Sequence, residues 1–295
     1  MSYLIGIDCG GTHIMGQLWQ TQPEKLLTEV PGEPGNLTLN YDTAVANLEH
    51  VLDELLSTCP AAPEQILIGL AGLEASGQAT KLQKQLVAQY HLPIQLVSDA
   101  KLALLNGLQG QDGMLIIAGT GSVIYARQQG HFFRNGGWGY ILGDEGSAFD
   151  IAKTALQQVL KAYDNDTLSS LTQPLLTKLQ ATDIQDAVHT FYNQDRTQNA
   201  QLAMTVANLA QQNNPEAQYI IELCAKKLSQ QALNLLHHHQ MTLPTKIVLS
   251  GSVLLNNQAF QTALKQSIQS QISAIDFLPV SHNNAHGVLY WHYWQ

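Results

Sequence analysis

The sequence is poor in cysteine. Its 295 residues include three, Cys9, Cys59 and Cys224, which are far apart and form no Cys-x-x-Cys pair. Disulfide frameworks use even numbers of cysteines, and thiolate metal sites use close spacing. The count and the spacing therefore argue against both kinds of site.

Positive charge is also scarce. Lys and Arg number 14 against 23 Asp and Glu, so the formal net charge is −9. Nucleic acids and anionic membranes attract proteins through a basic face, so we expect neither as a partner. A phosphate site built from backbone N–H groups needs no net basic charge, and nucleotides remain compatible with this composition.

Long apolar runs are missing as well. The first apolar segment is about six residues long and ends at Asp8, which is too short for a signal peptide or a membrane span. We therefore expect a cytoplasmic protein. What the chain does contain is an ordinary apolar fraction of 45% in a length sufficient for two domains.

Short apolar strands alternate with helical stripes, a pattern typical of an α/β fold. The first strand leads into a tight turn and a returning strand, and the turn carries Asp8, Gly10, Gly11 and Thr12. We call Asp8–Thr12 the first tip. Glycine N–H groups and a threonine hydroxyl can bind phosphate oxygens, and the carboxylate can reach Mg²⁺ directly or through water. A plain hairpin can show the same residues, so the tip alone leaves both interpretations open.

The same arrangement recurs in the middle of the chain. A strand over residues 114–118 is followed by a turn with Thr120, Gly121 and Ser122, and then by a returning strand. We call Gly119–Ser122 the second tip. The repeat suggests two similar domains that grip one polyphosphate from opposite sides. The signatures G-x-x-x-x-G-K-[ST] and strand-G-x-G-x-x-G do not occur at these turns, which disfavours the corresponding nucleotide folds.

Three further residues of the first half are candidates for substrate contact. Asp99 follows the strand over residues 94–97, and open α/β sheets bind ligands at such strand ends; an N-cap for the following helix is the alternative. Asn36 lies in a loop rich in Pro and Gly, where it either presents its amide to a ligand or forms the turn. Gly72 lies in the glycine turn that follows the strand starting at Gln65.

The stretch from Gly136 to Ala148 is rich in glycine and feeds a helix. Its Gly137 gives the backbone freedom to approach a ligand, Trp138 offers a flat apolar face, and Asp144 offers two strong acceptors. A ring beside a carboxylate is a common way to bind a sugar, since the ring covers C–H faces and the carboxylate accepts hydroxyl protons. The alternative is a glycine turn with a core tryptophan and a helix-capping acid.

The remainder is expected to be mostly helical to about Leu243, followed by strands at Lys246–Ser250 and Ile275–Val280. Gly251 and Ser252 form a strand-end turn that suits a flat ring such as adenine but also suits any strand-to-helix connection. His237–His239 cannot converge on a metal from one helix, because consecutive residues point about 100° apart. We expect the aromatic tail to pack as a short terminal helix.

Together these motifs resemble the sugar kinase, actin and heat-shock ATPase superfamily. Within it the chain is similar to the BadF/BadG/BcrA/BcrD ATPase family, the group of N-acetylglucosamine kinases and the activator ATPases of 2-hydroxyacyl-CoA dehydratases. The resemblance implies two ribonuclease-H-like domains, residues 1–113 and 114–295, with ATP and substrate in a cleft between them. The second would carry a helical insertion and a final helix that packs back on the first.

The resemblance also implies roles for individual residues. The expected activity is ATP-dependent phosphorylation of an amino sugar, N-acetylglucosamine at its 6-hydroxyl, with Asp99 as general base. The implied contacts to ATP and Mg²⁺ are Asp8 (to Mg²⁺ through water), Gly10, Gly11, Thr12, Thr120, Gly121, Ser122, Gly251 and Ser252. The implied contacts to the sugar are Asn36, Gly72, Asp99, Gly137, Trp138 and Asp144. A homodimer is usual for relatives.

Three alternatives to phosphorylation of N-acetylglucosamine are another sugar substrate, an activator ATPase and a sensor. Leu37 and Thr38 replace an aromatic of the animal enzyme, so glucosamine, N-acetylmuramic acid and glucose remain candidate substrates. An activator ATPase would need cysteine ligands for an iron–sulfur cluster, and residues 120–150 contain none. A sensor that binds sugar or nucleotide without catalysis is the third alternative, and the joint presence of Asp8, Asp99 and Thr120 argues against it.

Overall fold

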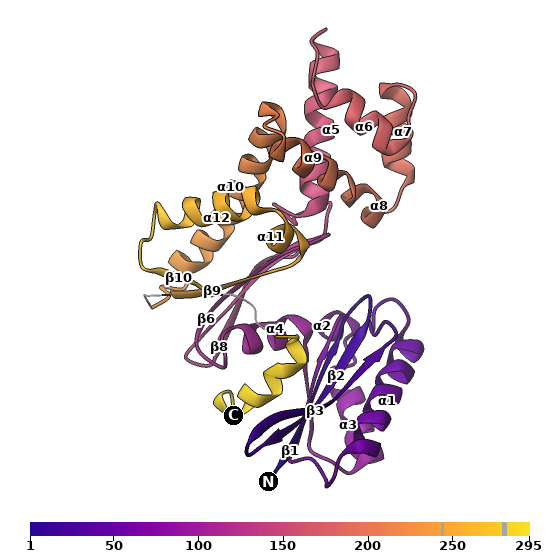
Figure 1. Cartoon of the computed structure of the whole chain (residues 1–295), viewed down its shortest axis with the longest axis vertical. Helices are drawn as coiled ribbons and strands as arrows, with labels where there is room; N and C mark the ends of the chain where they lie inside the picture. The colour runs from indigo at the N-terminus through magenta and orange to yellow at the C-terminus, as the bar shows by residue number, and fades with distance from the viewer. Residues whose placement is uncertain (243–244, 279–281) are drawn as a thin grey trace. The chain divides into compact units, whose positions relative to one another are not determined.

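The computed structural model describes residues 1–242, 245–278 and 282–295. The chain divides into two compact units, Met1–Gly113 with Leu278–Gln295, and Met114–Phe277. Each unit has one five-stranded sheet with helices packed on it (Figure 1), which confirms the predicted α/β class. The strand predicted to reach Val280 is observed to Leu278; Pro279 and Val280 lie outside the described residues.

The first unit is built on a sheet of strand order β3-β2-β1-β4-β5. The antiparallel pairs are β1–β2 and β2–β3, whereas β1–β4 and β4–β5 are parallel. Buried parallel strands read as continuous apolar runs, which explains why β1 and β4 are recognisable in the sequence. The strands are β1 (Tyr3–Cys9), β2 (Ile14–Thr21), β3 (Glu24–Gly32), β4 (Gln65–Leu70) and β5 (Ile94–Ser98).

Helices cover this sheet and complete its core. They are α1 (Tyr41–Thr58), α2 (Leu73–Ser76), α3 (Ala79–Tyr90), α4 (Asp99–Gly107) and the 3₁₀ helix η1 (Asn284–Tyr293), yellow in Figure 1. Helix α1 packs on β2 and β3, and η1 packs on α4 and β1. A Cβ built on Gly6 of β1 would lie 1.8 Å from the Ala285 carbonyl oxygen. Only glycine therefore lets η1 come this close to the strand.

The second unit has a sheet of strand order β10-β9-β6-β7-β8. Strands β6 and β9 are parallel, and β7 and β8 form an antiparallel hairpin. The strands are β6 (Gly113–Ala118), β7 (Ser122–Gln128), β8 (His131–Gly136), β9 (Thr245–Ser250) and β10 (Ile275–Leu278). Each unit thus contains a strand, a glycine-containing tip and a second strand, as the sequence repeat predicts.

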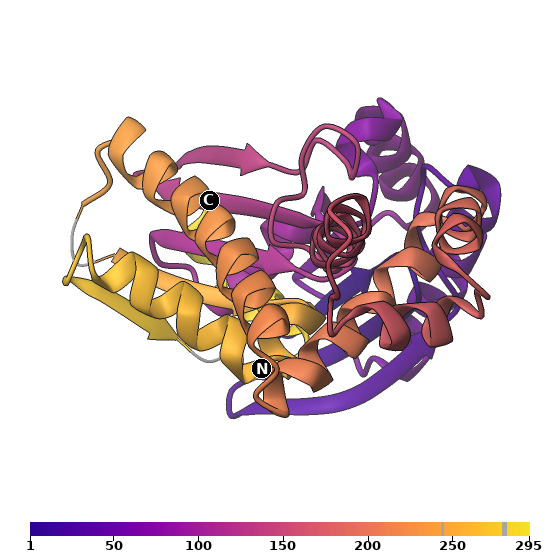
Figure 2. The ribbon, with the colours of Figure 1, turned by 90° about the horizontal axis from the view of Figure 1, so that it is seen from above.

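Helices form the rest of the second unit, as expected. They are α5 (Ala148–Asp164), α6 (Thr172–Leu179), α7 (Ile184–Asn193), α8 (Arg196–Ala200), α9 (Leu202–Gln211), α10 (Pro215–His238), α11 (Ser252–Asn256) and α12 (Gln258–Gln269). The long α10 packs beside α12 (Figure 2). Cys224 is buried on α10. Across the described ranges, no helix is long and apolar enough to cross a membrane, and no three potential metal ligands cluster.

Candidate functional site

In the first unit, Asp8 and Asp99 are two buried carboxylates, and the charge of Asp99 acts on Asp8. Asp8 is near the end of β1, and its Oδ2 accepts a hydrogen bond of 3.0 Å from Asn284 Nδ2. The pKa of Asp8 is raised to about 6, chiefly by burial and also by the charge of Asp99, although the Asn284 hydrogen bond lowers it. Burial also raises the pKa of Asp99, although N–H donors, including Ala100, favour its ionised form.

These two acids fit a divalent cation. Ionised carboxylates that are withdrawn from water and repel each other are destabilised, and a nearby cation would lower both pKa values. Mg²⁺ prefers such oxygen ligands and usually keeps several of its waters. A carboxylate in this environment has the chemistry to hold Mg²⁺ through water, and that role of Asp8 stays a prediction.

Asp99 is not the helix cap considered as its alternative role. The N-cap of α4 is Ser98, whose Oγ accepts from the Lys101 N–H at 3.3 Å. Asp99 is the first residue of the helix, and its Oδ1 accepts from the Ala100 N–H at 2.9 Å. The N-cap interpretation is therefore wrong by one residue, and the carboxylate lies at the carboxyl end of β5.

Asn36 lies beside two glycines that were predicted with it. Its Oδ1 accepts from the Thr38 N–H at 2.9 Å and from the Thr38 hydroxyl at 2.8 Å, so the turn-forming role is confirmed. A Cβ on Gly72 would lie 2.7 Å from Asn36 Oδ1, and one on Gly11 would lie 3.7 Å from Asn36 Nδ2. The fold thus brings the candidate amide close to the first tip and to the turn after β4.

The first tip itself is a tight turn. Gly10 N–H donates to the His13 carbonyl at 3.0 Å, and the Thr12 hydroxyl lies 3.0 Å from His13 Nδ1. Gly10, Gly11 and Thr12 belong to no regular element. Gly11 and Thr12 are exposed, so this tip lies at the surface of the unit.

In the second unit, the second tip lies next to Gly251 and Ser252. Parallel pairing places Ile117 opposite Ser250, so the turns that follow β6 and β9 are neighbours. Gly251 has a φ of +92°, and a Cβ there would lie 2.4 Å from the Ala118 carbonyl oxygen. The turn therefore requires glycine, and it directs Ser252 toward Gly119, whose Cβ would lie 3.6 Å from Ser252 Oγ.

A cavity of about 250 Å³ opens beside these turns. Thr120 and Ser252 line it, and α5, α9 and α11 contribute apolar walls that include Ile151, Ala203 and Val253. The Thr197 and Gln201 side chains add polar groups. Ligand sites combine apolar walls with a few polar groups in this way.

The stretch Gly136–Ala148 presents its tryptophan and its acid in opposite ways. Trp138 is 70% exposed, so the core-tryptophan alternative is wrong. The Arg134 Cζ lies 4.5 Å from the centroid of the Trp138 ring, and Gly137 has a φ of +71°, which favours glycine. Asp144 is 4% exposed and has a φ of +60°. Ser147, not Asp144, caps α5.

Asp144 is paired with a residue that the sequence did not single out. Its Oδ2 accepts from Arg196 Nη2 at 2.8 Å. Burial raises the pKa of Asp144, while Arg196 and the N–H groups of Ser122 and Gly139 oppose that shift. Arg196 was missed because it is 52 residues away in sequence; the only local signal is the capping box of Asp195 and Gln198.

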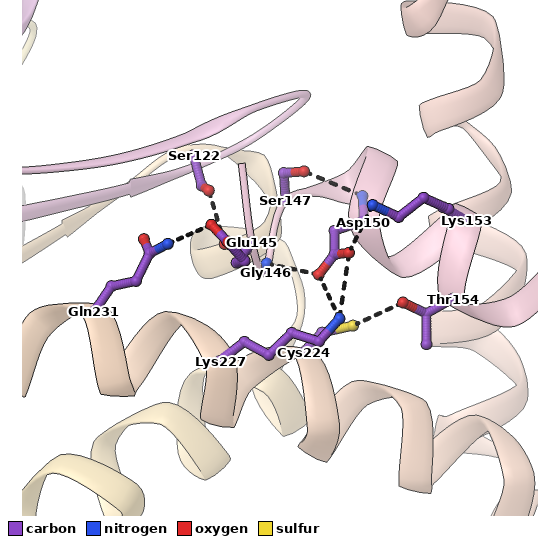
Figure 3. A network of polar contacts seen from close by, with 10 residues as sticks. All are labelled: Ser122, Glu145, Gly146, Ser147, Asp150, Lys153, Thr154, Cys224, Lys227 and Gln231. Carbon is purple, nitrogen blue, oxygen red and sulfur yellow. Dashed lines mark hydrogen bonds and ion pairs between the residues drawn. The ribbon is translucent and has the colours of Figure 1, made fainter. Parts of the chain in front are cut away.

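A polar network attaches this stretch to α5 and α10 (Figure 3). Ser122 Oγ donates to the Glu145 carbonyl at 2.7 Å, and Gln231 donates to the Glu145 carboxylate. Buried Asp150 accepts from the Gly146 N–H at 3.0 Å and pairs with Lys227 at 3.2 Å. The second tip is therefore bonded to the end of the glycine stretch, which is held in turn to α5 and α10.

Two sheets, each with a glycine-tipped hairpin, define an actin-like ATPase fold. The chain belongs to the BadF/BadG/BcrA/BcrD ATPase family, whose model matches residues 5–284. This confirms the family predicted from the motifs.

Individual relatives agree with that assignment. An N-acetylmuramic acid/N-acetylglucosamine kinase of Clostridium acetobutylicum is 34% identical over 170 residues, 56% of this chain and 55% of that protein. The match thus spans little more than half of the clostridial relative. An N-acetyl-D-glucosamine kinase of Dictyostelium discoideum is 31% identical over 221 residues, which are 70% of this chain and 69% of that protein. A Chromobacterium violaceum structure, provisionally described as an N-acetylglucosamine kinase, shares the fold with a TM-score of 0.76, 24% identity, and coverage of 100% of this chain and 99% of that one.

Proposed function

We propose that this chain is an ATP-dependent kinase of an amino sugar, with N-acetylglucosamine as the first candidate and its 6-hydroxyl as the acceptor. The observation that carries the proposal is the pair of carboxylates, Asp8 and Asp99, whose pKa values are both raised by burial. The amino-sugar substrates named for the clostridial and Dictyostelium relatives support the substrate class.

In this proposal Asp99 is the general base. It accepts the proton of the sugar hydroxyl as that oxygen forms a bond to the γ-phosphorus of ATP, and the bond from the γ-phosphorus to the ADP oxygen breaks. A raised pKa suits this role, because a base is most effective when its pKa approaches the working pH. Positioning and electrostatic stabilisation supply the larger part of catalysis in phosphoryl transfer.

The remaining residues bind the two substrates. The N–H groups of the first and second tips donate to phosphate oxygens, and the cavity beside Ser252 accepts the adenosine. Asn36, Gly72, Gly137, Trp138 and Asp144 contact the sugar. When bound near Asp8, Mg²⁺ would neutralise charge on the phosphates.

The cysteines do not favour the activator ATPase. Burial raises the pKa of Cys224 to about 12 and also raises that of Cys9. Thiols with raised pKa values are poor sources of the thiolates that a cluster requires. This supports the kinase over the iron–sulfur alternative.

The test is an ADP-release assay with ATP and Mg²⁺ across N-acetylglucosamine, glucosamine, N-acetylmuramic acid and glucose. We expect at least one amino sugar to raise ADP production well above the sugar-free rate, and ³¹P–¹H NMR to locate the new phosphate ester at C6. No stimulation by any of these sugars would contradict the proposed function, and an ester at another carbon would contradict the acceptor assignment.

A further inference from the structure

Arg196 lies where three parts of the second unit meet. It is the first residue of α8, and its Nη2 donates to Asp144 Oδ2 at 2.8 Å. A Cβ built on Gly121 would lie only 2.0 Å from Nη2. The guanidinium is thus packed against the backbone of the second tip, and the Tyr140 ring centroid is 5.8 Å from its Cζ. Arg196 therefore contacts both the proposed phosphate site and the proposed sugar site.

One donor of this guanidinium is unused. The Arg196 Nε atom is buried and has no hydrogen-bond partner among the described residues. A buried donor without a partner costs about 1–3 kcal/mol. Guanidinium groups bind phosphates and carboxylates through parallel N–H donors, so a ligand oxygen beside the second tip would satisfy this group.

Asp144 depends on the same arginine. It is buried with a φ of +60°, a conformation that residues other than glycine adopt rarely. A carboxylate must be ionised for both of its oxygens to act purely as hydrogen-bond acceptors from hydroxyl groups. Without Arg196 this buried carboxylate would lose its counter-charge, and a buried charge left unpaired is strongly destabilised.

We propose that Arg196 is a positioning residue that couples the two substrates. It holds Asp144 ionised and oriented for a sugar hydroxyl, and its Nε donates to a phosphate oxygen of the nucleotide at the second tip. This inference rests on the proposed kinase function. Helix α8 suits such coupling, because the next residue, Thr197, lines the cavity proposed for adenosine.

The test compares Arg196→Gln, Arg196→Lys and Asp144→Asn with Lys178→Gln, which removes an exposed charge from α6 of the same unit. We expect Arg196→Gln to raise the KM values for sugar and for ATP by about tenfold or more each. Arg196→Lys should give KM values between those of the wild type and Arg196→Gln, because its ammonium group keeps the charge but lacks the planar set of N–H donors. The control variant, Lys178→Gln, should have the KM values of the wild type.

The double variant Arg196→Gln with Asp144→Asn separates the two roles. The effects on the sugar KM should be far from additive, since Arg196 acts on the sugar through Asp144, whereas the effect on the ATP KM should persist. A purely structural role would lower the melting temperature and the active fraction but leave both KM values unchanged. KM values within about twofold of wild type in folded Arg196→Gln would overturn the proposal.

Failure of the kinase function would be seen separately. If the wild type phosphorylates no sugar, calorimetric titration with a non-hydrolysable ATP analogue still tests the arginine. We then expect Arg196→Gln to weaken analogue binding by about tenfold. Equal affinity for the two proteins would overturn the role of Arg196 at the nucleotide.

Discussion

Asn284 donates a hydrogen bond of 3.0 Å to the Asp8 carboxylate across 276 positions of sequence. The bond favours the ionised acid, but burial and the charge of Asp99 outweigh it and leave the Asp8 pKa at about 6. The last helix of the chain therefore influences the protonation of the first tip. The pH dependence of stability should report this relationship.

Asp8→Asn should raise stability at neutral pH. Native Asp8, with a pKa of about 6 against an ordinary 3.8, binds more protons than the unfolded chain between these values. Its contribution to stability therefore falls as pH rises through about 4 to 6 and stays lost above that range. Thermal melts from pH 4 to 8 should show a higher Tm for the variant at pH 7, together with weaker Mg²⁺-dependent turnover. A Tm at pH 7 below that of wild type would contradict the assignment.

His286 should change the pH dependence of stability in the opposite direction to Asp8. Burial lowers its pKa to about 4 from 6.5, and its Nδ1 lies 3.1 Å from Asn106 Oδ1. The unfolded chain binds more protons between these pKa values, so this contribution to stability is lost as pH falls from about 6.5 to 4. His286→Gln should flatten that loss in melts over the same range. The control is His50→Gln, which changes an exposed residue of α1 and should leave the loss of stability at acid pH as in the wild type.

Asp99→Asn should lower kcat by about 10²–10⁴-fold with little change in sugar affinity, because it removes proton acceptance but keeps the shape. Single-turnover kinetics and sugar titration measure the two effects. Asp53→Asn changes an acid of the same unit that accepts from the Tyr90 hydroxyl at 2.8 Å, and it should keep wild-type turnover. Full activity of Asp99→Asn would rule out the base assignment.

Gly251→Ala should be more destabilising than Gly130→Ala. Their φ values are +92° and +81°, so both substitutions strain the backbone. Only at Gly251 would the new Cβ meet other atoms, at 2.4 Å from the Ala118 carbonyl oxygen, whereas Gly130 has open space around it. We expect about 1 kcal/mol for Gly130→Ala, a clearly larger loss for Gly251→Ala in urea unfolding, and weaker nucleotide binding for the latter alone. Equal unfolding midpoints would show that the turn can adjust.

Local pattern was enough to predict the sheets and both tips. Continuous apolar strands ending in glycine turns identify β1, β4 and β6, and helical stripes identify α1 and α10, because burial itself imposes these periods. Very short elements were not predicted: α2 has four residues and α8 has five. So few residues carry too little periodicity to be recognised.

The partners of the candidate side chains were beyond sequence reasoning. Asn284 and Arg196 reach Asp8 and Asp144 through tertiary folding, and their spacings along the chain follow no motif. The exposure of the Trp138 side chain also could not be predicted, because a glycine-rich stretch can hold a tryptophan either in the core or at the surface. Coordinates were needed to distinguish these cases.

The close approach of η1 to β1 at Gly6 has a consequence for biosynthesis. The first unit contains both Met1–Gly113 and Leu278–Gln295, so a growing polypeptide cannot complete it until residues 278–295 have been translated. Until then the η1-binding face of β1 has no cover, and Asp8 lacks its amide donor. A chain interrupted just after Phe277 would thus contain the whole second unit, while Asp8 would still lack the Asn284 hydrogen bond.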